Sequence, residues 1–288
     1  MLLAALGFSV MGGSAKLLKE SFNAGQLVFF RNLVGLIVLI ISFSARRPVN
    51  SGGKFHLLIF RGLMGTTALY TLLYCILHIP LGTAMTYNLT SALFIAIFSF
   101  LLFGEYHGRI VLFAVLLGFA GMILIYKPAI HFPWYYHAAG LLSGITSALA
   151  YITVGRLYKY YDPRIIVLAF ILTGFLVPLL FMAIKTIFQL PADDVFFIAW
   201  RWPQGIEWLY ISSLGLAALF GQYFVTRSYG ADKAGIVSAV SYTNIIFSVF
   251  VGVALGDAFP DLMSWGGIFC IISGGIIISL VKWRSSAA

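Results

Sequence analysis

The chain is built of apolar runs about 20 residues long, cut by short polar joints, and the pattern continues to the C-terminus. From Ser21 to Gly104 it contains no aspartate or glutamate. An apolar run of about 18 residues or more can cross the roughly 30 Å hydrocarbon core of a bilayer as a helix. The pattern therefore predicts ten membrane-spanning helices, over residues 1–18, 25–44, 55–77, 82–103, 109–126, 137–157, 163–187, 206–229, 233–255 and 260–282.

The composition supports an all-α integral membrane protein. Hydrophobic residues make up 61% of the chain and charged residues only 9%, whereas a soluble domain carries about a quarter charged residues. Only helices and closed barrels satisfy their backbone groups in lipid. The apolar runs are continuous rather than alternating, which excludes barrel strands. Cys75 and Cys270 each lie inside an apolar run and are interpreted as packing residues.

The net charge of +9 is a topology signal rather than a nucleic-acid footprint. With the N-terminus inside, twelve lysines and arginines, Arg61 among them, lie at the cytoplasmic ends of the spans. Five lie on the opposite side, and Arg31 is left inside a span. The positive-inside rule then places both termini in the cytoplasm, and we expect a multi-pass protein of a bacterial inner membrane.

Two parts of the chain resemble each other. Residues 81–126 comprise a span, Gly104-Glu105, a turn and a glycine-rich span, and residues 233–280 repeat this order around Gly256-Asp257. We therefore expect two five-helix halves, 1–128 and 137–284. Because five is odd, the halves enter the membrane with opposite topology. Inverted repeats around a midplane site are a recurrent construction of secondary transporters, although duplication alone also fits a channel.

Short motifs in a fixed order add a family resemblance. They are Lys16, Phe30-Arg31, Phe60-Arg61-Gly62, Ile79-Pro80-Leu81, Gly104-Glu105 and the degenerate second copy Gly256-Asp257. Together they resemble the EamA-type branch of the drug/metabolite transporter (DMT) superfamily, over nearly the whole chain. The resemblance implies the DMT fold: ten helices as two inverted repeats, both termini inside, and a central cavity between the halves.

The chain departs from this family pattern at two places. Members often carry a proline thirteen residues before the glutamate of Gly-Glu, a residue that kinks the span. Here that position is Ala92, and its counterpart in the second half is Asn244. Both spans thus lack the proline, and Asn244 adds a polar side chain at mid-membrane.

Arg31 is the clearest candidate for a functional charge, because charged side chains inside a span are costly. It lies about six residues, or roughly 9 Å, into its span, and the second half aligns Ile171 there. Arg31, with Asn32 beside it, is expected to bind an anionic group or to organise a gate, the alternative being an arginine that snorkels to the headgroups. Lys16 is also a candidate, although snorkelling is favoured. Arg61 is interpreted as an interfacial or structural arginine.

The acidic residues are expected at joints or span ends. A proton-coupled antiporter for cations needs a membrane-buried carboxylate that both binds the cation and titrates. The sequence offers none at mid-depth. The expected substrates are therefore anionic, zwitterionic or neutral metabolites.

Uncharged polar side chains at mid-span complete the candidate binding or gating set. They are Tyr70, Tyr74, Tyr87, Asn88, Ser91, Tyr151, Gln222, Tyr223, Ser241, Tyr242 and Asn244. Aromatic and amide groups of this kind suit a small polar ligand held by hydrogen bonds and ring contacts. The alternative is that the hydroxyl and amide groups bridge helices. Trp200 and Trp202, in the longest joint, are interpreted as interfacial anchors rather than a gating lid.

The predicted function is secondary transport, by alternating access, of a small metabolite such as an amino acid, an S-adenosylmethionine-like compound or a small organic anion. A channel or lipid scramblase of the same architecture is the alternative, and an intramembrane enzyme fits least. The histidines are too scattered for a metal site, and no catalytic residue or cofactor is expected. The expected partners are the metabolite and the lipid bilayer, with no nucleic acid, and the protein is expected to be a monomer or homodimer.

Overall fold

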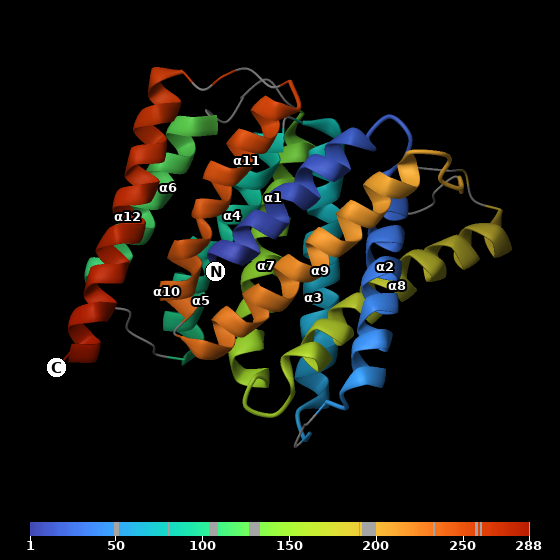
Figure 1. Ribbon diagram of the computed structural model, residues 1–288, viewed down its shortest axis with the longest axis horizontal. Coiled ribbons are helices and arrows are strands. Elements are labelled where there is room, and N and C mark those ends of the chain that lie inside the picture. The colour runs from blue at the N-terminus through green and yellow to red at the C-terminus, as the bar shows by residue number, and fades with distance from the viewer. Residues whose placement is uncertain are drawn as a thin grey trace.

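The computed structural model describes residues 1–48, 52–79, 81–103, 109–126, 133–189, 191, 200–232, 234–256, 259 and 261–287. Within them the chain forms twelve helices (Figure 1): α1 Leu2–Leu17, α2 Ala24–Ala45, α3 Phe55–His78, α4 Leu81–Leu89, α5 Ser91–Phe103, α6 Arg109–Tyr126, α7 Trp134–Leu157, α8 Pro163–Phe188, α9 Glu207–Ala231, α10 Ala234–Ser241, α11 Thr243–Ala254 and α12 Leu262–Ala287. The pairs α4/α5 and α10/α11 each form one divided span, so the described helices make the ten predicted spans.

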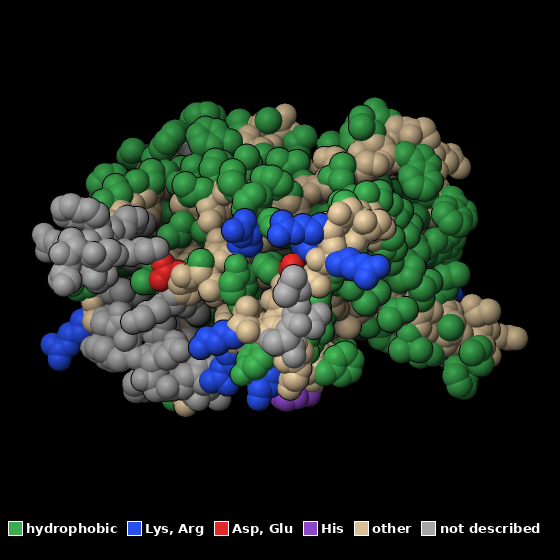
Figure 2. Space-filling view, turned by 60° about the horizontal axis from the view of Figure 1, so that its bottom comes forward, with side chains coloured by type: hydrophobic (Ala, Val, Ile, Leu, Met, Phe, Trp, Pro, Cys, Tyr) green, Lys and Arg blue, Asp and Glu red, His purple; other side chains and the backbone are tan. Residues whose placement is uncertain are grey.

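The surface of the helix bundle is that of a multi-pass membrane protein. Five helices, α2, α3, α7, α8 and α9, are long and apolar enough to cross a bilayer on their own, with mean hydropathies of 1.3 to 2.8. Large apolar side chains such as Leu262 and Phe269 are 88% and 72% exposed. Figure 2 shows hydrophobic side chains over most of the visible face, a surface that requires lipid rather than water.

The two halves of the fold pack against each other in matching pairs. α1 of the first half packs on α9 of the second, and their counterparts α7 and α3 pack on each other in the same way. Likewise α1 packs on α11, and their counterparts α7 and α5 pack on each other. α2 packs on its own counterpart α8, and α6 on α12, at opposite edges of the bundle in Figure 1. Exchanging the halves therefore preserves the packing. With five spans in each half, this is the inverted-repeat DMT fold that the sequence predicts.

The fourth and ninth spans are divided even though both lack proline. The first break is at Thr90 and the second at Tyr242, each fourteen residues before the glycine of a Gly-acid pair. The Thr90 hydroxyl donates to the Tyr87 carbonyl at 2.6 Å, and the Thr243 hydroxyl donates to the Val240 carbonyl at 2.8 Å. Hydroxyl bonds to the backbone compete with the regular helix ladder, and both occur where these spans divide without a proline.

The glycine of the second Gly-acid pair ends its span. Gly256 has a φ of +92°, a conformation that favours glycine, and its amide donates to the Val253 carbonyl at 3.0 Å. α11 therefore stops two residues earlier, at Ala254. Four further motif positions, Pro80, Gly104, Glu105 and Asp257, lie outside the described residues.

Candidate functional site

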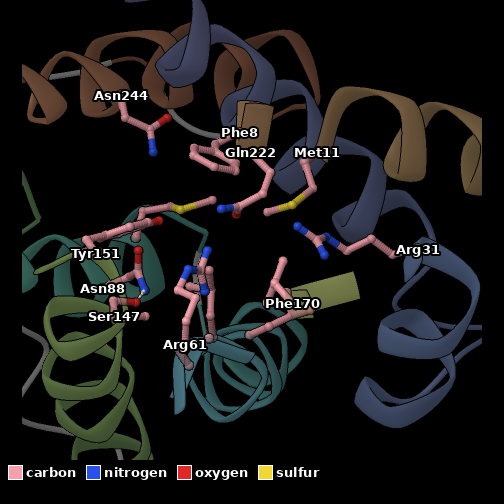
Figure 3. Close-up of a pocket in the computed structure, with 16 residues that line it drawn as sticks. Phe8, Met11, Arg31, Arg61, Asn88, Ser147, Tyr151, Phe170, Gln222 and Asn244 are labelled. Carbon is pink, nitrogen blue, oxygen red and sulfur yellow. Dashed lines mark hydrogen bonds between the residues drawn. The ribbon is translucent and has the colours of Figure 1, made fainter. Parts of the chain in front are cut away.

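A cavity lies between the two halves (Figure 3), with about 530 Å³ of empty space that includes its opening to solvent. Eight helices line it: α1, α2, α3 and α4 from the first half and α7, α8, α9 and α11 from the second. The lining residues are Phe8, Met11, Arg31, Arg61, Gly65, Ala68, Leu69, Leu72, Met85, Asn88, Ser147, Ala150, Tyr151, Phe170, Gln222 and Asn244. The cavity is therefore built at the interface between the two halves.

Arg31 points into this cavity from α2 and is only 4% exposed. Its Nη1 donates to the Asn32 side-chain oxygen at 3.1 Å, and the Asn32 amide donates to the Val28 carbonyl at 2.7 Å. The Arg31 guanidinium also lies 5.1 Å from the centre of the Phe170 ring. Arg31 is directed inward rather than towards a headgroup layer, and Asn32 holds it there without lining the cavity.

Arg61, interpreted from the sequence as an interfacial or inter-helix structural arginine, is buried and contacts aromatic rings of α7 and α8. It is 1% exposed and lines the cavity from α3. Among the described residues it makes no hydrogen bond or ion pair, and its guanidinium lies 4.9 Å from the Phe170 ring and 5.9 Å from the Tyr151 ring. Gly65, one turn further along α3, leaves the space: a Cβ there would collide with Arg61 Nη1 and with Phe170.

Two asparagines join the halves at the cavity. The Asn88 amide on α4 donates to the hydroxyls of Ser143 and Ser147 on α7, at 2.8 and 2.9 Å. The Asn244 side-chain oxygen on α11 accepts the Ser9 hydroxyl of α1 at 2.6 Å. In Figure 3 the remaining oxygen of Asn88 and the remaining nitrogen of Asn244 face the cavity. One amide therefore offers an acceptor to the cavity and the other offers a donor.

Gln222 and Tyr151 complete the polar lining. Gln222 on α9 is 4% exposed, and its Nε2 has no hydrogen-bond partner in the described part of the chain. The Tyr151 ring on α7 stacks on Tyr229 at 5.0 Å between centroids, which fixes its plane. Of the sequence candidates, the cavity thus brings together Arg31, Asn88, Tyr151, Gln222 and Asn244.

The other candidate residues lie around the cavity or away from it. Buried side chains that do not line it are Asn32, Tyr70, Ser91, Ser241 and Tyr242. Tyr242 packs against α6 at Gly118, where an added Cβ would lie 2.5 Å from the ring. The half-buried candidates are Lys16, Tyr74, Tyr87 and Tyr223.

The half-buried aromatic candidates contact other side chains. Tyr74 packs on Tyr136, with ring centroids 5.6 Å apart. The Tyr87 hydroxyl forms a hydrogen bond with His137. The Tyr223 ring lies 6.0 Å below the Arg227 guanidinium. These contacts tie α3 and α4 to α7 and place Tyr223 outside the cavity lining.

An aromatic cluster of Phe29, Phe30 and Trp200 lies next to Arg31. Trp200 packs on both rings, with centroids 5.0 Å from Phe29 and 5.5 Å from Phe30. Beyond it, Gln26 and Trp200 help to line a surface depression of about 900 Å³. Along α2 the cluster thus separates the depression from the cavity. Trp200 is half-buried in this cluster, and Trp202 is 60% exposed.

The cavity contains no acidic residue among its described lining residues. The five described carboxylates all lie at helix ends: Glu20, Asp162, Glu207, Asp232 and Asp261. Two of them pair with arginines, Asp162 with Arg164 at 3.2 Å and Glu207 with Arg201 at 3.0 Å. The remaining four acids lie outside the described residues. No group of three His, Cys, Asp or Glu that could hold a metal occurs in the described part of the chain.

Comparisons with known proteins agree on transport. The model of the EamA-like transporter family matches residues 1–127. An "Uncharacterized transporter" of Helicobacter pylori is 32% identical over 285 residues, covering 97% of this chain and 93% of the relative. The "Pseudopaline exporter CntI" of Pseudomonas aeruginosa is 29% identical, over 97% of this chain and 94% of the relative.

More distant matches also cover nearly the whole chain. "Solute carrier family 35 member G1" of Homo sapiens is 22% identical, over 99% of this chain and 79% of the relative. A crystal structure superposes with a TM-score of 0.74 at 18% sequence identity, over 96% of each chain. That likeness is one of fold alone.

Proposed function

Since the chain belongs to the EamA-like transporter family, we propose that it is a secondary carrier that moves a small polar metabolite with an acidic group by alternating access. The observation that carries the proposal is the cavity between the halves, which holds Arg31 and Arg61 and no acidic side chain among its described lining residues. A buried guanidinium without a carboxylate partner attracts an anion. A small organic anion, or an amino acid held by its carboxylate, fits best, and a ligand with a fixed positive charge fits least.

The names of the relatives support a small-molecule substrate and a non-enzymatic role. One relative is named as an exporter of pseudopaline, and another is named as a member of a solute carrier family. We include export as the direction of transport, because the pseudopaline exporter spans the same length as this chain. No catalytic step forms part of the proposal.

Alternating access is supported by the packing. Because the helix contacts persist when the halves are exchanged, two arrangements of similar energy are available to the bundle. The divided spans at Thr90 and Tyr242 provide places where the backbone can bend without breaking a full helix ladder. The aromatic cluster of Phe29, Phe30 and Trp200 closes one approach to the cavity, which favours a carrier over an open pore.

We further propose that residues 1–128 and 137–284 are the two moving repeats and that both termini face the cytoplasm of a bacterial inner membrane. The joints α2–α3, α7–α8 and α9–α10 meet at one end of the bundle (Figure 1), and Figure 2 shows lysines and arginines gathered there. Because Arg61 lines the cavity, the count that favours this orientation becomes eleven cationic side chains against five. Relatives in Helicobacter and Pseudomonas support the bacterial location.

Counterflow in proteoliposomes tests the proposal. A carboxylate that raises the melting temperature of the purified protein is used both as unlabelled load and as labelled external substrate. A carrier accelerates labelled uptake when preloaded, whereas a channel does not, and a scramblase moves labelled lipid instead. Uptake that is independent of preloading would contradict the carrier proposal.

The Arg31→Ala variant tests the role of the cavity cation. It should reduce counterflow at least tenfold while the protein still inserts and elutes as wild type in size-exclusion chromatography, because a charge-assisted contact is worth about 1.5–3 kcal/mol. The matched control is Arg227→Ala, which removes an exposed arginine of α9 outside the cavity lining. Undiminished transport by well-folded Arg31→Ala protein would refute the assignment.

A further inference from the structure

We propose that the substrate carries two carboxylates, one bound by Arg31 and the other by Arg61, on either side of Phe170. This inference rests on the proposed carrier function and names the substrate class of the same cavity. It concerns Arg61 above all, because sequence reasoning alone assigns that residue no ligand.

The guanidinium groups of Arg31 and Arg61 are both buried with few hydrogen-bond partners. Arg31 is 4% exposed and uses one nitrogen for Asn32, while its Nε is buried without a hydrogen-bond partner. Arg61 is 1% exposed, its Nε is likewise unpartnered, and among the described residues it bonds to nothing. A guanidinium carries five N–H donors, and a buried charge without an acceptor is strongly unfavourable. Both groups therefore lack acceptors that a ligand would supply.

The distance between the guanidinium groups of Arg31 and Arg61 suits a ligand with two acidic groups. Arg31 and Arg61 come from different helices, α2 and α3, and Phe170 lies between them in the view of Figure 3. Their guanidinium carbons are 5.1 and 4.9 Å from the centre of the same ring, so they are at most 10.0 Å apart. A carboxylate paired in a fork has its carbon about 4 Å from the guanidinium carbon. A chain of roughly three to six carbons with an acid at each end can reach both groups.

The residues around Arg61 hold its side chain in the cavity. Gly65 is the residue one turn along α3 whose missing Cβ leaves room for Arg61 Nη1. The rings of Phe170 and Tyr151 contribute cation–π contacts without any acceptor atom. The guanidinium is thus held in position while its N–H groups stay available.

The amides on the far wall suit the remainder of such a substrate. The Asn88 oxygen can accept a hydrogen bond from an amino or hydroxyl group, and the Asn244 nitrogen can donate one. Both asparagines are anchored by serines of the opposite half. A dicarboxylate that also carries a polar substituent would therefore contact both halves of the carrier at once.

The experiment is a binding series on the full-length protein in detergent. Malonate, succinate, glutarate, adipate and glutamate are each compared with the monocarboxylate of equal chain length, and inorganic phosphate is included. At least one diacid should bind about ten- to a hundredfold tighter than its monoacid, the effect of one additional charge-assisted contact. The preference should fall to about unity in Arg31→Gln and in Arg61→Gln, and should persist in the control Arg227→Gln.

Several results would overturn the inference. Diacids that bind no tighter than monoacids throughout the series, or phosphate that binds tighter than every diacid, would do so with wild-type protein alone. If Arg61→Gln does not fold, Arg61→Lys keeps the charge but loses the fork, and an undiminished diacid preference there would contradict the pairing. Counterflow of a monoacid that is lost in Arg31→Ala but unchanged in Arg61→Gln would leave the carrier proposal standing and remove this one.

Discussion

The two halves of the bundle pack in the same way but place different chemistry on the cavity. Helices α1–α6 contribute both cations, Arg31 and Arg61, whereas helices α7–α12 contribute the rings of Phe170 and Tyr151 and the amide of Gln222. Under the proposed carrier function, matched packing would allow the second arrangement that alternating access requires. The lining is unmatched, because both of its described cations come from one half. The comparison suggests that symmetry serves transport and that its loss serves recognition.

The two halves also differ at single aligned positions. The position aligned with Arg31 is Ile171, which is 2% exposed and packs against Gly35 of α2. At the helix starts, α2 is capped by Asn23, whose side chain accepts the Gln26 amide at 3.0 Å, and α8 is capped by the charged Asp162. Substitutions that make one half resemble the other therefore test whether these differences matter.

The largest effect is expected from Ile171→Arg, which would give the second half a cation like that of the first. Ile171 lies beside Arg31 and away from the main cavity, so the new guanidinium would be buried without a partner and close to another cation. We expect a loss of about 3–5 kcal/mol in the free energy of unfolding, measured by chemical denaturation in detergent. Ile171→Met preserves volume and should cost less than about 1.5 kcal/mol. Equal stability of the two variants would show that the second half tolerates charge there.

A smaller effect is expected from Gly65→Ala, which removes the space that Arg61 occupies. The added methyl group would overlap Arg61 Nη1 and the Phe170 ring, and overpacking of this kind costs about 1–3 kcal/mol. Counterflow should decrease at least tenfold because the guanidinium is displaced. Gly266→Ala on α12 is the control, since no atom lies within 4 Å of the Cβ it would add. Transport that is equally reduced in both variants would indicate a general loss of packing instead.

The smallest effect is expected from Asp162→Asn, which gives α8 the type of cap that α2 has. Partial burial raises the pKa of Asp162, but hydrogen bonds from the Arg164 side chain and backbone outweigh it, and the pKa is lowered overall. A lowered pKa in the folded state contributes stability above the unfolded pKa, near 4, and this is lost as the pH falls through the folded value.

Asparagine keeps the cap but not the charge, so Asp162→Asn should cost at most about 1 kcal/mol at pH 7. The cost should decrease as the pH falls below about 4, because the stabilising charge is lost as the pH approaches the lowered folded-state pKa. Thermal unfolding at pH 7 and pH 3 measures the difference. A cost that is equal at pH 7 and pH 3 would mean that the Arg164 ion pair contributes nothing.

Most of the fold could be predicted from hydropathy, because crossing a bilayer imposes a length and a composition on every span. The expected spans agree with the observed helices to within three residues, except that α12 continues to Ala287. The breaks at Thr90 and Tyr242 could not be predicted in this way. Both residues lie inside runs that remain apolar, and the proline that marks such a break is absent.

The lining of the cavity was less predictable, because it depends on the direction in which each side chain points within the bundle. Arg61 lies six residues into α3, a depth from which an arginine can reach either the headgroups or the bundle interior. The glycine at position 65 was the available signal, since a missing side chain one turn away leaves room for the guanidinium to turn inward. Nothing in the sequence distinguishes Phe170 from the other 25 phenylalanines. Ser147 could have been found through its spacing of one turn from Ser143.

The break at Tyr242 also shapes the electric field of the cavity. Because α11 starts at Thr243, its first turn lies at a helix N-terminus, where the Ile245 amide donates to the Tyr242 carbonyl at 3.0 Å. Such an end carries the equivalent of about half a positive charge, and Asn244, in that first turn, lines the cavity. The half that contributes no cationic side chain to the described lining therefore still presents the positive end of a helix to the cavity.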